Sequence, residues 1–225
     1  MYDQTRARVE TYFDRTATKT WERLTSDAPV SRIRETVRAG RERMRDLMLS
    51  RLPEDLRGAR ILDAGCGPGM ATIEMAKRGA TVVAADISPQ LIDIAQLRLP
   101  HDLQKQVTFH AGDMLDPKLG TFDAVIAMDS LIYYTAPDIG DALATLEPRV
   151  SGPIVFTVAP RTPALMAMWY AGKAFPRSDR SPVMIPHAHT KLAKAAKAAG
   201  ARRMLRPVDR ITSGFYISEA MELRP

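Results

Sequence analysis

A glycine-rich loop is the stretch of this sequence best suited to bind a ligand. The segment DAGCGPG, residues 63–69, places Gly65, Gly67 and Gly69 after a strand-like run and before a helix-like run. Glycines in this place allow a tight turn and a close approach of the backbone to a ligand. The dinucleotide fingerprint is G-x-G-x-x-G. This loop reads G-x-G-x-G instead, because position 70 is Met70.

Three carboxylates accompany the loop. Asp86 ends the next predicted strand, where a carboxylate can accept hydrogen bonds from two ribose hydroxyls, as in NAD-binding enzymes. Asp113 ends the strand after that, and Asp63 precedes the glycines and either contacts the ligand or ties down the loop. Cys66 is interpreted as a small residue that fits a crowded loop, since no His, Lys or Arg flanks it to activate a thiol.

A fourth polar cluster follows another predicted strand. In FDAVIAMDSLIYYTAPD, residues 122–138, an apolar run ends at Met128 and opens into Asp129, Tyr133 and Tyr134. In an open α/β sheet, ligands bind at the carboxyl ends of the strands. These groups are therefore expected beside the glycine loop.

The elements that must position these residues alternate along the chain. Short strands that alternate with helices predict an α/β fold with a doubly wound, mostly parallel, seven-stranded sheet. An N-terminal helical arm, 1–51, precedes a ligand-binding domain, 52–225, and residues 160–188 read as an inserted cover. The expected strands are 59–65, 80–86, 107–113, 122–128, 152–158, 203–210 and 213–223, and the expected helices are 4–24, 30–51, 70–78, 89–99, 138–148 and 190–200.

Composition narrows the class of protein. With 225 residues and 45% hydrophobic content, the chain reads as an ordinary globular protein. A single cysteine excludes an internal disulfide and fits a reducing cytoplasm. The polar start, MYDQTRARVE, does not resemble a signal peptide, and no apolar run of about 18 residues predicts a membrane span.

The net charge of +6 is partly concentrated in residues 31–51, which hold seven arginines. In the predicted helix 30–51, Arg34, Arg38, Arg41 and Arg45 form a stripe that borders the apolar face. This stripe either lines the edge of a ligand site or is a solvated face.

The ordered glycine loop and carboxylates, over residues 59–160, resemble the class I S-adenosylmethionine-dependent methyltransferases, which have a Rossmann-like fold. This resemblance implies that Gly65 and Gly67 pass beneath the methionine part of the cofactor. Asp86 would hold the ribose, Asp113 the adenine amino group, and the backbone near Met128 the methionine amino group. The full set implied for S-adenosylmethionine, or its product S-adenosylhomocysteine, is Asp63, Gly65, Gly67, Asp86, Ile87, Asp113, Met114, Met128 and Asp129.

The N-terminal arm narrows the resemblance. Residues 12–45, with a T-A-x-x-x-W element ending at Trp21, resemble the magnesium protoporphyrin IX O-methyltransferases, especially the bacteriochlorophyll branch. The later MDSLIYY and FPRSDRSP stretches agree with this family. It implies methyl transfer to a propionate carboxylate of the magnesium porphyrin. Magnesium would then belong to the substrate, and no metal site of the enzyme is expected.

Several residues are assigned to the substrate on this basis. Tyr133 stands where the cyanobacterial and plant branch has a histidine, and we expect it to position the propionate, with His187 as a second candidate for chemistry. Arg34, Arg38 and Arg41 are expected to clamp the propionates. Trp21, Tyr134 and Trp169 are expected to line a slot for the macrocycle, together with Leu165, Met166, Met168 and Phe175, unless these side chains are ordinary core.

Three alternatives remain open at this stage. They are another small-molecule methyltransferase acting on a quinone precursor, a tetrapyrrole carrier without turnover, and an RNA methyltransferase. No nucleic-acid partner is expected, because the N/D-P-P-Y/F/W tetrapeptide of base-amino methyltransferases does not follow the fourth predicted strand. A cytoplasmic location, with at most peripheral contact with the photosynthetic membrane, is expected. Magnesium chelatase is a candidate partner that would hand over the substrate.

Overall fold

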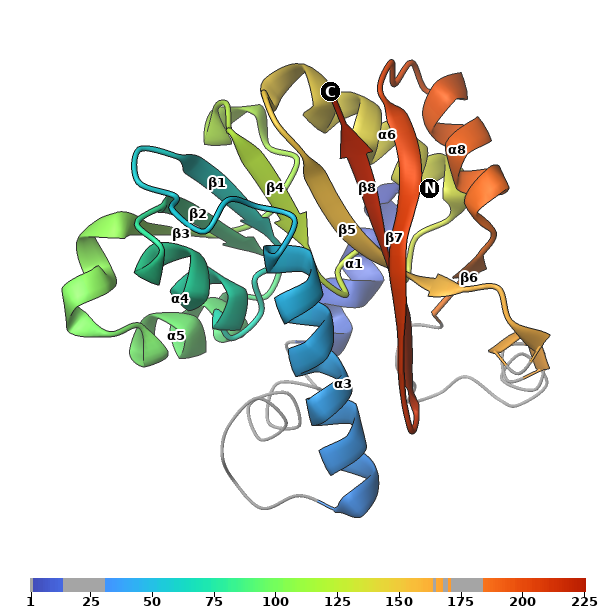
Figure 1. Ribbon diagram of the computed structural model, residues 1–225, viewed down its shortest axis with the longest axis horizontal. Coiled ribbons are helices and arrows are strands. Elements are labelled where there is room, and N and C mark those ends of the chain that lie inside the picture. Colours follow the sequence, from blue (N-terminus) through green and yellow to red (C-terminus); the bar gives the residue numbers. More distant parts are fainter. Residues whose placement is uncertain (1, 14–30, 164, 168–169, 171–183) are drawn as a thin grey trace.

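The computed structural model describes residues 2–13, 31–163, 165–167, 170 and 184–225 (Figure 1). The described helices are α1 (Tyr2–Tyr12), α3 (Arg32–Leu49), α4 (Met70–Lys77), α5 (Pro89–Arg98), α6 (Ala136–Leu146) and α8 (His189–Ala198). The described strands are β1 (Arg60–Ala64), β2 (Thr81–Asp86), β3 (Val107–Ala111), β4 (Ala124–Ala127), β5 (Ile154–Pro160), β6 (Pro186–His187), β7 (Met204–Ser213) and β8 (Tyr216–Arg224).

The strands form one twisted sheet. Seven of them follow the order β3-β2-β1-β4-β5-β8-β7, and β6 pairs with the end of β5 beside this path. Strands β1 to β5 run parallel, β8 is antiparallel to β5, and β7 is antiparallel to β8. The predicted doubly wound sheet is therefore confirmed. The chain reverses its direction of travel across the sheet between β1 and β4, which is where such sheets bind ligands.

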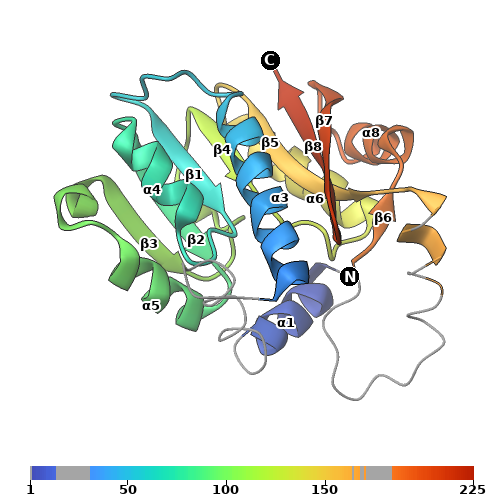
Figure 2. The same cartoon turned by 60° about the horizontal axis from the view of Figure 1, so that its bottom comes forward.

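The two faces of the sheet belong to two cores. In β4, Ala124 and Ile126 pack with α3 and α4, whereas Val125 and Ala127 pack with α6 and α8. This alternation follows from the period of two in a strand, and burial on both faces is typical of a parallel sheet. Figures 1 and 2 show α3 and α4 on one side of the sheet and α6 and α8 on the other.

Local signals fix the helices that frame the site. Ser88 caps α5, since its hydroxyl accepts the N–H of Leu91 at 3.3 Å. Thr135 and Asp138 form a capping box at the start of α6. At the other end of a helix, Gly200, with φ of 102°, follows α8 as a left-handed terminator.

The two described arm helices are joined to different cores. Val9 of α1 is buried in the core on the α6 side, and Met44 of α3 is fully buried in the core on the α4 side. Helix α3 also contacts the β7–β8 hairpin, where Ser213 Oγ donates to the carbonyl oxygen of Thr36 at 2.8 Å. A Cβ on Gly40 would lie only 2.7 Å from the Tyr216 ring, so glycine permits this approach. The arm, 1–51, is thus integrated with the sheet in its described part.

Some boundaries differ from those expected. The helix expected over 4–24 is present up to Tyr12, and its remainder from residue 14 lies outside the described residues. Most of the proposed cover, 160–188, also lies outside them, but its end forms β6, a strand too short for a sequence pattern to reveal. Among the described helices, none combines the length and the apolar character that a membrane span requires.

Candidate active site

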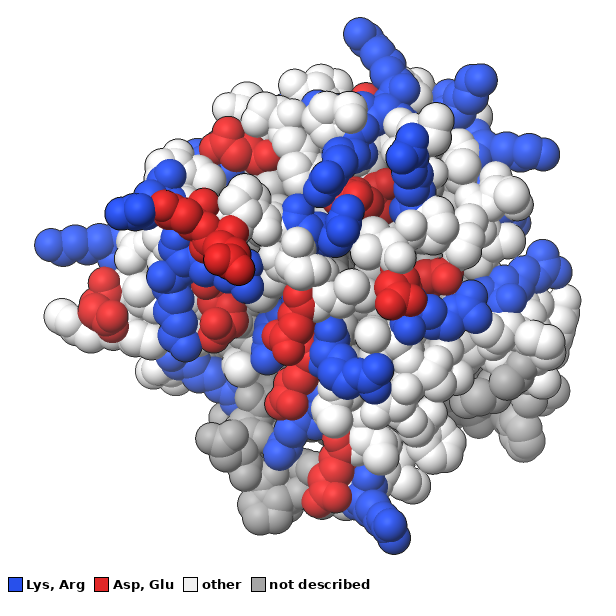
Figure 3. All heavy atoms as spheres, in the orientation of Figure 1, with Lys and Arg blue, Asp and Glu red and all other residues white. Residues whose placement is uncertain are grey.

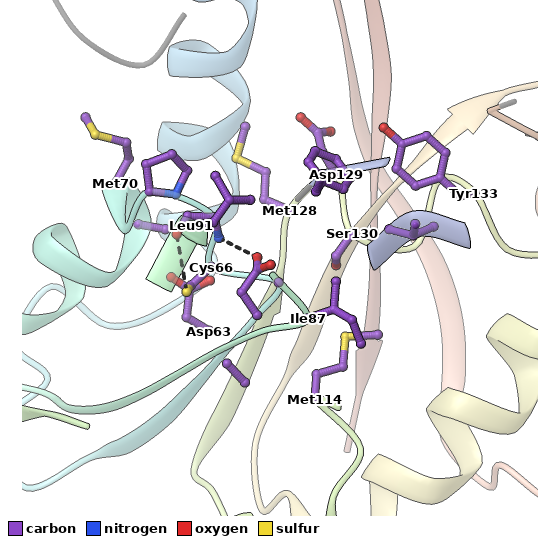
Figure 4. Close-up of a pocket in the computed structure, with 18 of the residues that line it drawn as sticks. Asp63, Cys66, Met70, Ile87, Leu91, Met114, Met128, Asp129, Ser130 and Tyr133 are labelled. Atoms are coloured by element: carbon purple, nitrogen blue, oxygen red, sulfur yellow. Dashed lines mark hydrogen bonds between the residues drawn. The ribbon is translucent and has the colours of Figure 1, made fainter. Parts of the chain in front are cut away.

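A pocket opens at the carboxyl ends of β1, β2 and β4 and the loop after β3, and α1 and α3 contribute to its walls. Figure 4 shows the glycine loop and α5 side chains on one side and Asp129 to Tyr133 on the other. The described residues that line it are Tyr2, Arg6, Val9, Phe13, Arg38, Arg41, Glu42, Arg45, Asp63, Gly65, Cys66, Gly67, Pro68, Met70, Ala71, Ala85, Asp86, Ile87, Leu91, Gly112, Asp113, Met114, Met128, Asp129, Ser130, Tyr133 and Tyr134.

The glycine loop turns in the left-handed region. Gly65 has φ of 81° and Gly67 has φ of 52°, conformations that side chains other than glycine rarely adopt. A Cβ on Gly65 would overlap the side chain of Ser130, so the loop approaches the end of β4 closely. A Cβ on Gly67 would meet no heavy atom within 4 Å. This face of the loop is open towards the pocket, as a ligand cradle requires.

Asp86 shapes the loop and also faces the pocket. Its carboxylate accepts the N–H of Gly67 at 2.8 Å and the N–H of Ser88 at 2.9 Å. The residue is only 7% exposed, and it ends β2 as the sequence predicts. Because Asp86 also lines the pocket, its carboxylate lies where a ligand hydroxyl can reach it.

Asp63 fulfils the tie-down role that the sequence left open, and it also lines the pocket. Thr72 Oγ1 of α4 donates to Asp63 Oδ2 at 2.5 Å. Burial raises the pKa of Asp63 to about 7, and the nearby Asp86 adds to the rise. Burial likewise raises the pKa of Cys66 well above its usual value, so the thiol stays protonated and is a poor nucleophile.

Asp113 lies at one end of the pocket, where α1 covers it. Tyr2 OH donates to Asp113 Oδ1 at 2.9 Å, and Arg6 Nη1 donates to Asp113 Oδ2 at 2.6 Å. The Tyr2 ring stacks on Tyr134, with ring centroids 5.0 Å apart. Tyr134, predicted to contact a flat substrate, therefore lies at the Asp113 end and contacts α1.

Asp129 lies at the opposite end, in an unusual backbone conformation with φ of 56°. Its N–H donates to Thr157 Oγ1 at 2.7 Å, and its carboxylate forms an ion pair with Arg41 of α3. Tyr216 OH of β8 also donates to Asp129, at 3.2 Å from Oδ1. Thr157 Oγ1 of β5 in turn donates to Asp129 Oδ1 at 3.1 Å, so α3, β5 and β8 all hold this carboxylate, and Asp129 pairs with the guanidinium of Arg41.

The arginine stripe of α3 is split by the structure. Arg38, Arg41 and Arg45 line the pocket, whereas Arg34 is exposed and is not part of the lining. Of the two readings left open for the stripe, the pocket edge thus holds for Arg38, Arg41 and Arg45, while Arg34, nearer the start of α3, is not brought into the lining. On the face in Figure 3, acidic side chains lie between the basic ones, so the charge of this face is mixed.

Tyr133 lines the pocket and is 7% exposed. Its ring meets Phe13 edge-on at 6.3 Å between centroids. Burial, reinforced by the charge of Asp129, raises the pKa of Tyr133 far above its usual value near 10. The phenol therefore remains protonated at neutral pH and can donate a hydrogen bond but cannot act as a base.

Comparisons with known proteins show that the chain is similar to methyltransferases. Residues 61–150 match a family model described as a methyltransferase domain, and residues 127–225 match one described as the magnesium-protoporphyrin IX methyltransferase C-terminus. Over all 225 residues the chain is 61% identical to a magnesium-protoporphyrin O-methyltransferase of Rhodobacter capsulatus, covering 98% of that protein. The chain belongs to the magnesium-protoporphyrin O-methyltransferase family.

A solved structure and a second group of relatives show which parts of the chain are shared with which enzymes. The structure of the Synechocystis PCC 6803 magnesium protoporphyrin IX methyltransferase with bound SAH matches it with a TM-score of 0.83 and 27% identity, over 97% of this chain and 99% of that one. A ubiquinone biosynthesis O-methyltransferase of Xanthomonas oryzae is 34% identical, but over only 54% of this chain and 52% of its own length. The class I methyltransferase fold is thus confirmed.

The structure of this family member does not bring His187 to the pocket. His187 is 3% exposed, and its Nε2 lies 2.9 Å from the carbonyl oxygen of Tyr134. Burial lowers the pKa of His187, so the ring is neutral and holds the Tyr134 backbone in place. Its predicted chemical role does not fit this position. Met166 lines a second cavity with His187, and Leu165 is buried outside the lining of the candidate pocket.

Four of the residues predicted to line the substrate slot cannot be placed, and three residues that contact the site carboxylates were not predicted. Trp21, Met168, Trp169 and Phe175 lie outside the described residues. Ile87, Met114 and Met128, which are predicted to contact the cofactor, line the pocket. Sequence reasoning missed Tyr2, Arg6 and Tyr216, whose contacts with Asp113 and Asp129 join residues 87 to 111 positions apart and leave no local pattern. Among the described residues, no group of three His, Cys, Asp or Glu side chains is arranged to hold a metal ion.

Proposed function

We propose that this protein transfers the methyl group of S-adenosylmethionine to one propionate carboxylate of magnesium protoporphyrin IX. The products are the monomethyl ester and S-adenosylhomocysteine, and the reaction serves (bacterio)chlorophyll synthesis. The observation that carries this proposal is the 61% identity with the Rhodobacter capsulatus enzyme across the full chain. This identity extends over the segments that we assign to the substrate, the arm and the C-terminal part, and over the segment that we assign to the cofactor.

The pocket suits the cofactor. Gly67 leaves open space where a side chain would stand, and Asp86 lines the pocket at the end of β2, where its carboxylate would face the ribose hydroxyls. Asp113 would take the adenine amino group, and the backbone at Met128 the methionine amino group. When bound, the cofactor supplies an electrophilic methyl group on a sulfonium. The protein holds that group against the end of β4, beside Asp129 and Tyr133.

The acceptor group, a propionate carboxylate, accounts for the arginines and the tyrosine in the pocket wall. A propionate is ionised near pH 7, because a carboxyl group has a pKa of about 4, so it needs no general base. It needs positioning and removal of water. We assign Arg38 and Arg41 to the charge of the propionates, and the protonated phenol of Tyr133 to a hydrogen bond that orients the reacting carboxylate.

Asp129 supports this assignment by holding Arg41. The pair is mostly shielded, with side-chain exposures of 18% for Arg41 and 7% for Asp129. A guanidinium fixed by a buried carboxylate keeps its remaining N–H groups in a defined direction. Asp129 is thus a positioning residue for Arg41. Tyr216 of β8 donates to Asp129 and helps to hold that carboxylate in place. We propose a positioning role for His187 too, through the Tyr134 carbonyl oxygen.

Two segments of the chain are candidates to cover the bound ligands. We propose that the arm, 1–51, and the inserted segment 160–188 cover the two ligands, and that closing them excludes water. Magnesium enters only as part of the substrate. The enzyme would work in the cytoplasm with at most peripheral contact with the photosynthetic membrane, where a hydrophobic pigment collects, or would receive its substrate from magnesium chelatase.

A binding experiment separates this function from its rivals. Mixing the protein with magnesium protoporphyrin IX should shift the visible absorption bands of the pigment, and a quinone precursor should not displace it. Displacement of the pigment by the quinone precursor would favour the quinone alternative, to which only about half of the chain shows similarity. A bound pigment without any turnover in the presence of S-adenosylmethionine would favour a carrier.

A further inference from the structure

Glu42 is the one acidic residue that α3 contributes to the described pocket lining, where it stands among Arg38, Arg41 and Arg45. No hydrogen bond or ion pair among the described residues involves its carboxylate, although Arg38 and Arg45 lie about one helical turn away on either side. An unpaired carboxylate beside the arginines that we assign to a dianionic pigment would repel that pigment, unless the carboxylate faces a positive charge. Its place in the pocket wall therefore needs an explanation.

The position of Glu42 around α3 puts it on the solvent side of the pocket. Met44 and Met48 are fully buried, and they define the side of the helix that faces the sheet. With about 100° between successive residues, Arg41 is nearest to that side, Arg38 follows and Glu42 is farthest from it. The exposures agree, because Arg41 and Arg38 are partly buried while Glu42 is exposed. Glu42 thus lies at the outer rim of the pocket.

This order matches the direction in which the pigment must lie. The proposed function brings one propionate to Asp129 and Tyr133, and Arg41 is the arginine that pairs with Asp129. Propionates are attached to the edge of the macrocycle, so the ring itself extends from Arg41 towards the rim. Glu42 then borders the space that the ring occupies, and the magnesium ion lies at the centre of that ring.

The magnesium ion of the pigment can accept a further ligand from the protein. It favours an octahedral shell with oxygen ligands, and carboxylates are among the groups that bind it in proteins. The four ring nitrogens occupy one plane, so the axial positions stay open. We propose that Glu42 supplies an axial oxygen ligand to the magnesium of the bound pigment and so distinguishes this pigment from metal-free protoporphyrin. The inference rests on the proposed function, because it requires the magnesium pigment as the acceptor.

The sulfonium of the cofactor is the other cation expected in the pocket. We assign its methyl group to the end of β4, beside Asp129, on the floor that the strand ends form. The ion pair with Asp129 brings Arg41 to that strand end, whereas Glu42 points further round the helix, to the rim. The position of Glu42 therefore fits the magnesium better than the sulfonium.

Titrations of the protein with two pigments, followed by absorption, test the assignment without turnover. The unaltered protein should bind magnesium protoporphyrin IX at least about tenfold more tightly than metal-free protoporphyrin IX, since even changes in the surroundings of a metal cost about 10- to 100-fold in affinity. In Glu42→Met, which has no oxygen ligand, the two affinities should agree to within about twofold. Affinity for the metal-free pigment should not fall, which shows that the pocket remains folded. Glu42→Gln, which keeps a neutral oxygen, should retain part of the preference.

Asp46→Met is the matched control, because Asp46 is an exposed carboxylate one turn further along α3 and is not part of the pocket lining. It should leave the preference for the magnesium pigment unchanged. Equal binding of both pigments by the unaltered protein, or a preference that Glu42→Met leaves intact, would overturn the inference while the proposed function stands.

Two further outcomes would also overturn the inference. If Glu42→Met weakened S-adenosylmethionine but not S-adenosylhomocysteine, and left the metal preference unchanged, Glu42 would face the sulfonium. If the unaltered protein bound neither pigment, the acceptor of the proposed function would be wrong, and the inference with it.

Discussion

Arg6 Nη1 lies 2.6 Å from Asp113 Oδ2, although the two residues are 107 positions apart in the sequence. Tyr2 OH donates to the other oxygen of the same carboxylate. These two contacts fasten α1 over the Asp113 end of the pocket. The carboxylate that we assign to the adenine amino group is therefore also the anchor of the N-terminal helix, so cofactor binding and arm position are coupled at one side chain.

Removing this ion pair should loosen α1. In Arg6→Met, amide hydrogens within residues 2–12 should exchange about two- to fivefold faster, the size expected for one partly exposed ion pair. Hydrogen exchange followed by mass spectrometry measures this directly. Arg8→Met is the control, because Arg8 is exposed and bonds only within α1 in the contacts described. Equal acceleration in both variants would mean that the Asp113 contact does not hold the helix.

The split of the arginine stripe leads to a paired prediction. Arg38→Met should raise the KM for magnesium protoporphyrin about tenfold, because a charged hydrogen bond to a propionate is lost, and should leave S-adenosylhomocysteine affinity unchanged. Arg34→Met should change neither quantity, since Arg34 is exposed outside the pocket lining. Steady-state kinetics gives both values. A rise in KM for Arg34→Met as large as that for Arg38→Met would contradict the split.

Tyr133 should behave as a donor and not as a base. Its pKa is raised far above 10 by burial, so the phenol does not ionise between pH 6 and 9. Tyr133→Phe should therefore lower kcat/KM by about tenfold, the loss of one hydrogen bond to a charged group, and leave the shape of the pH profile unchanged. A general base contributes more, about a hundredfold or above. A loss of that size together with a shifted pH profile would reassign Tyr133 as the base.

Asp63 should make stability depend on pH. Its pKa is about 7 in the folded protein and 3.8 in the reference state, so folding favours the protonated form. The contribution of Asp63 to stability is then fully present below about pH 4 and is lost as the pH rises through about 7. The free energy of unfolding of Asp63→Asn, relative to the unaltered protein, should rise by up to about 4 kcal/mol from pH 4 to pH 8.

Urea unfolding at several pH values measures this difference. Asp93→Asn, a substitution at an exposed carboxylate of α5, should show a difference that does not change with pH. If the difference for Asp63→Asn were equally flat, Asp63 would be ionised in the folded protein at all these pH values, and burial would not control its charge.

The sequence predicted the elements well where one local pattern decides them. Strands buried on both faces read as short apolar runs, and the turn residues around Gly65 and Gly200 mark where strand and helix end. Strand β6 was missed, because two residues give no period. The order β1-β4 in the sheet follows from general rules for parallel crossovers and not from any single residue.

The site was harder to predict, because its decisive contacts link distant segments. Residue type and position at a strand end were enough to select Asp86 and Asp113. They did not reveal that Asp113 receives Tyr2 and Arg6 or that Asp129 receives Arg41 and Tyr216. His187 was placed near the site by sequence proximity to the cover, yet packing directs its ring to the Tyr134 backbone.

One measurement tests the central claim most directly. The purified protein is mixed with magnesium protoporphyrin IX and methyl-labelled S-adenosylmethionine, and label is followed in the pigment extracted into organic solvent. The proposed function predicts one methyl group per pigment, carried as a monomethyl ester on a propionate. No label in the pigment, with S-adenosylhomocysteine still bound tightly by the protein, would contradict the assigned acceptor while leaving the cofactor site intact.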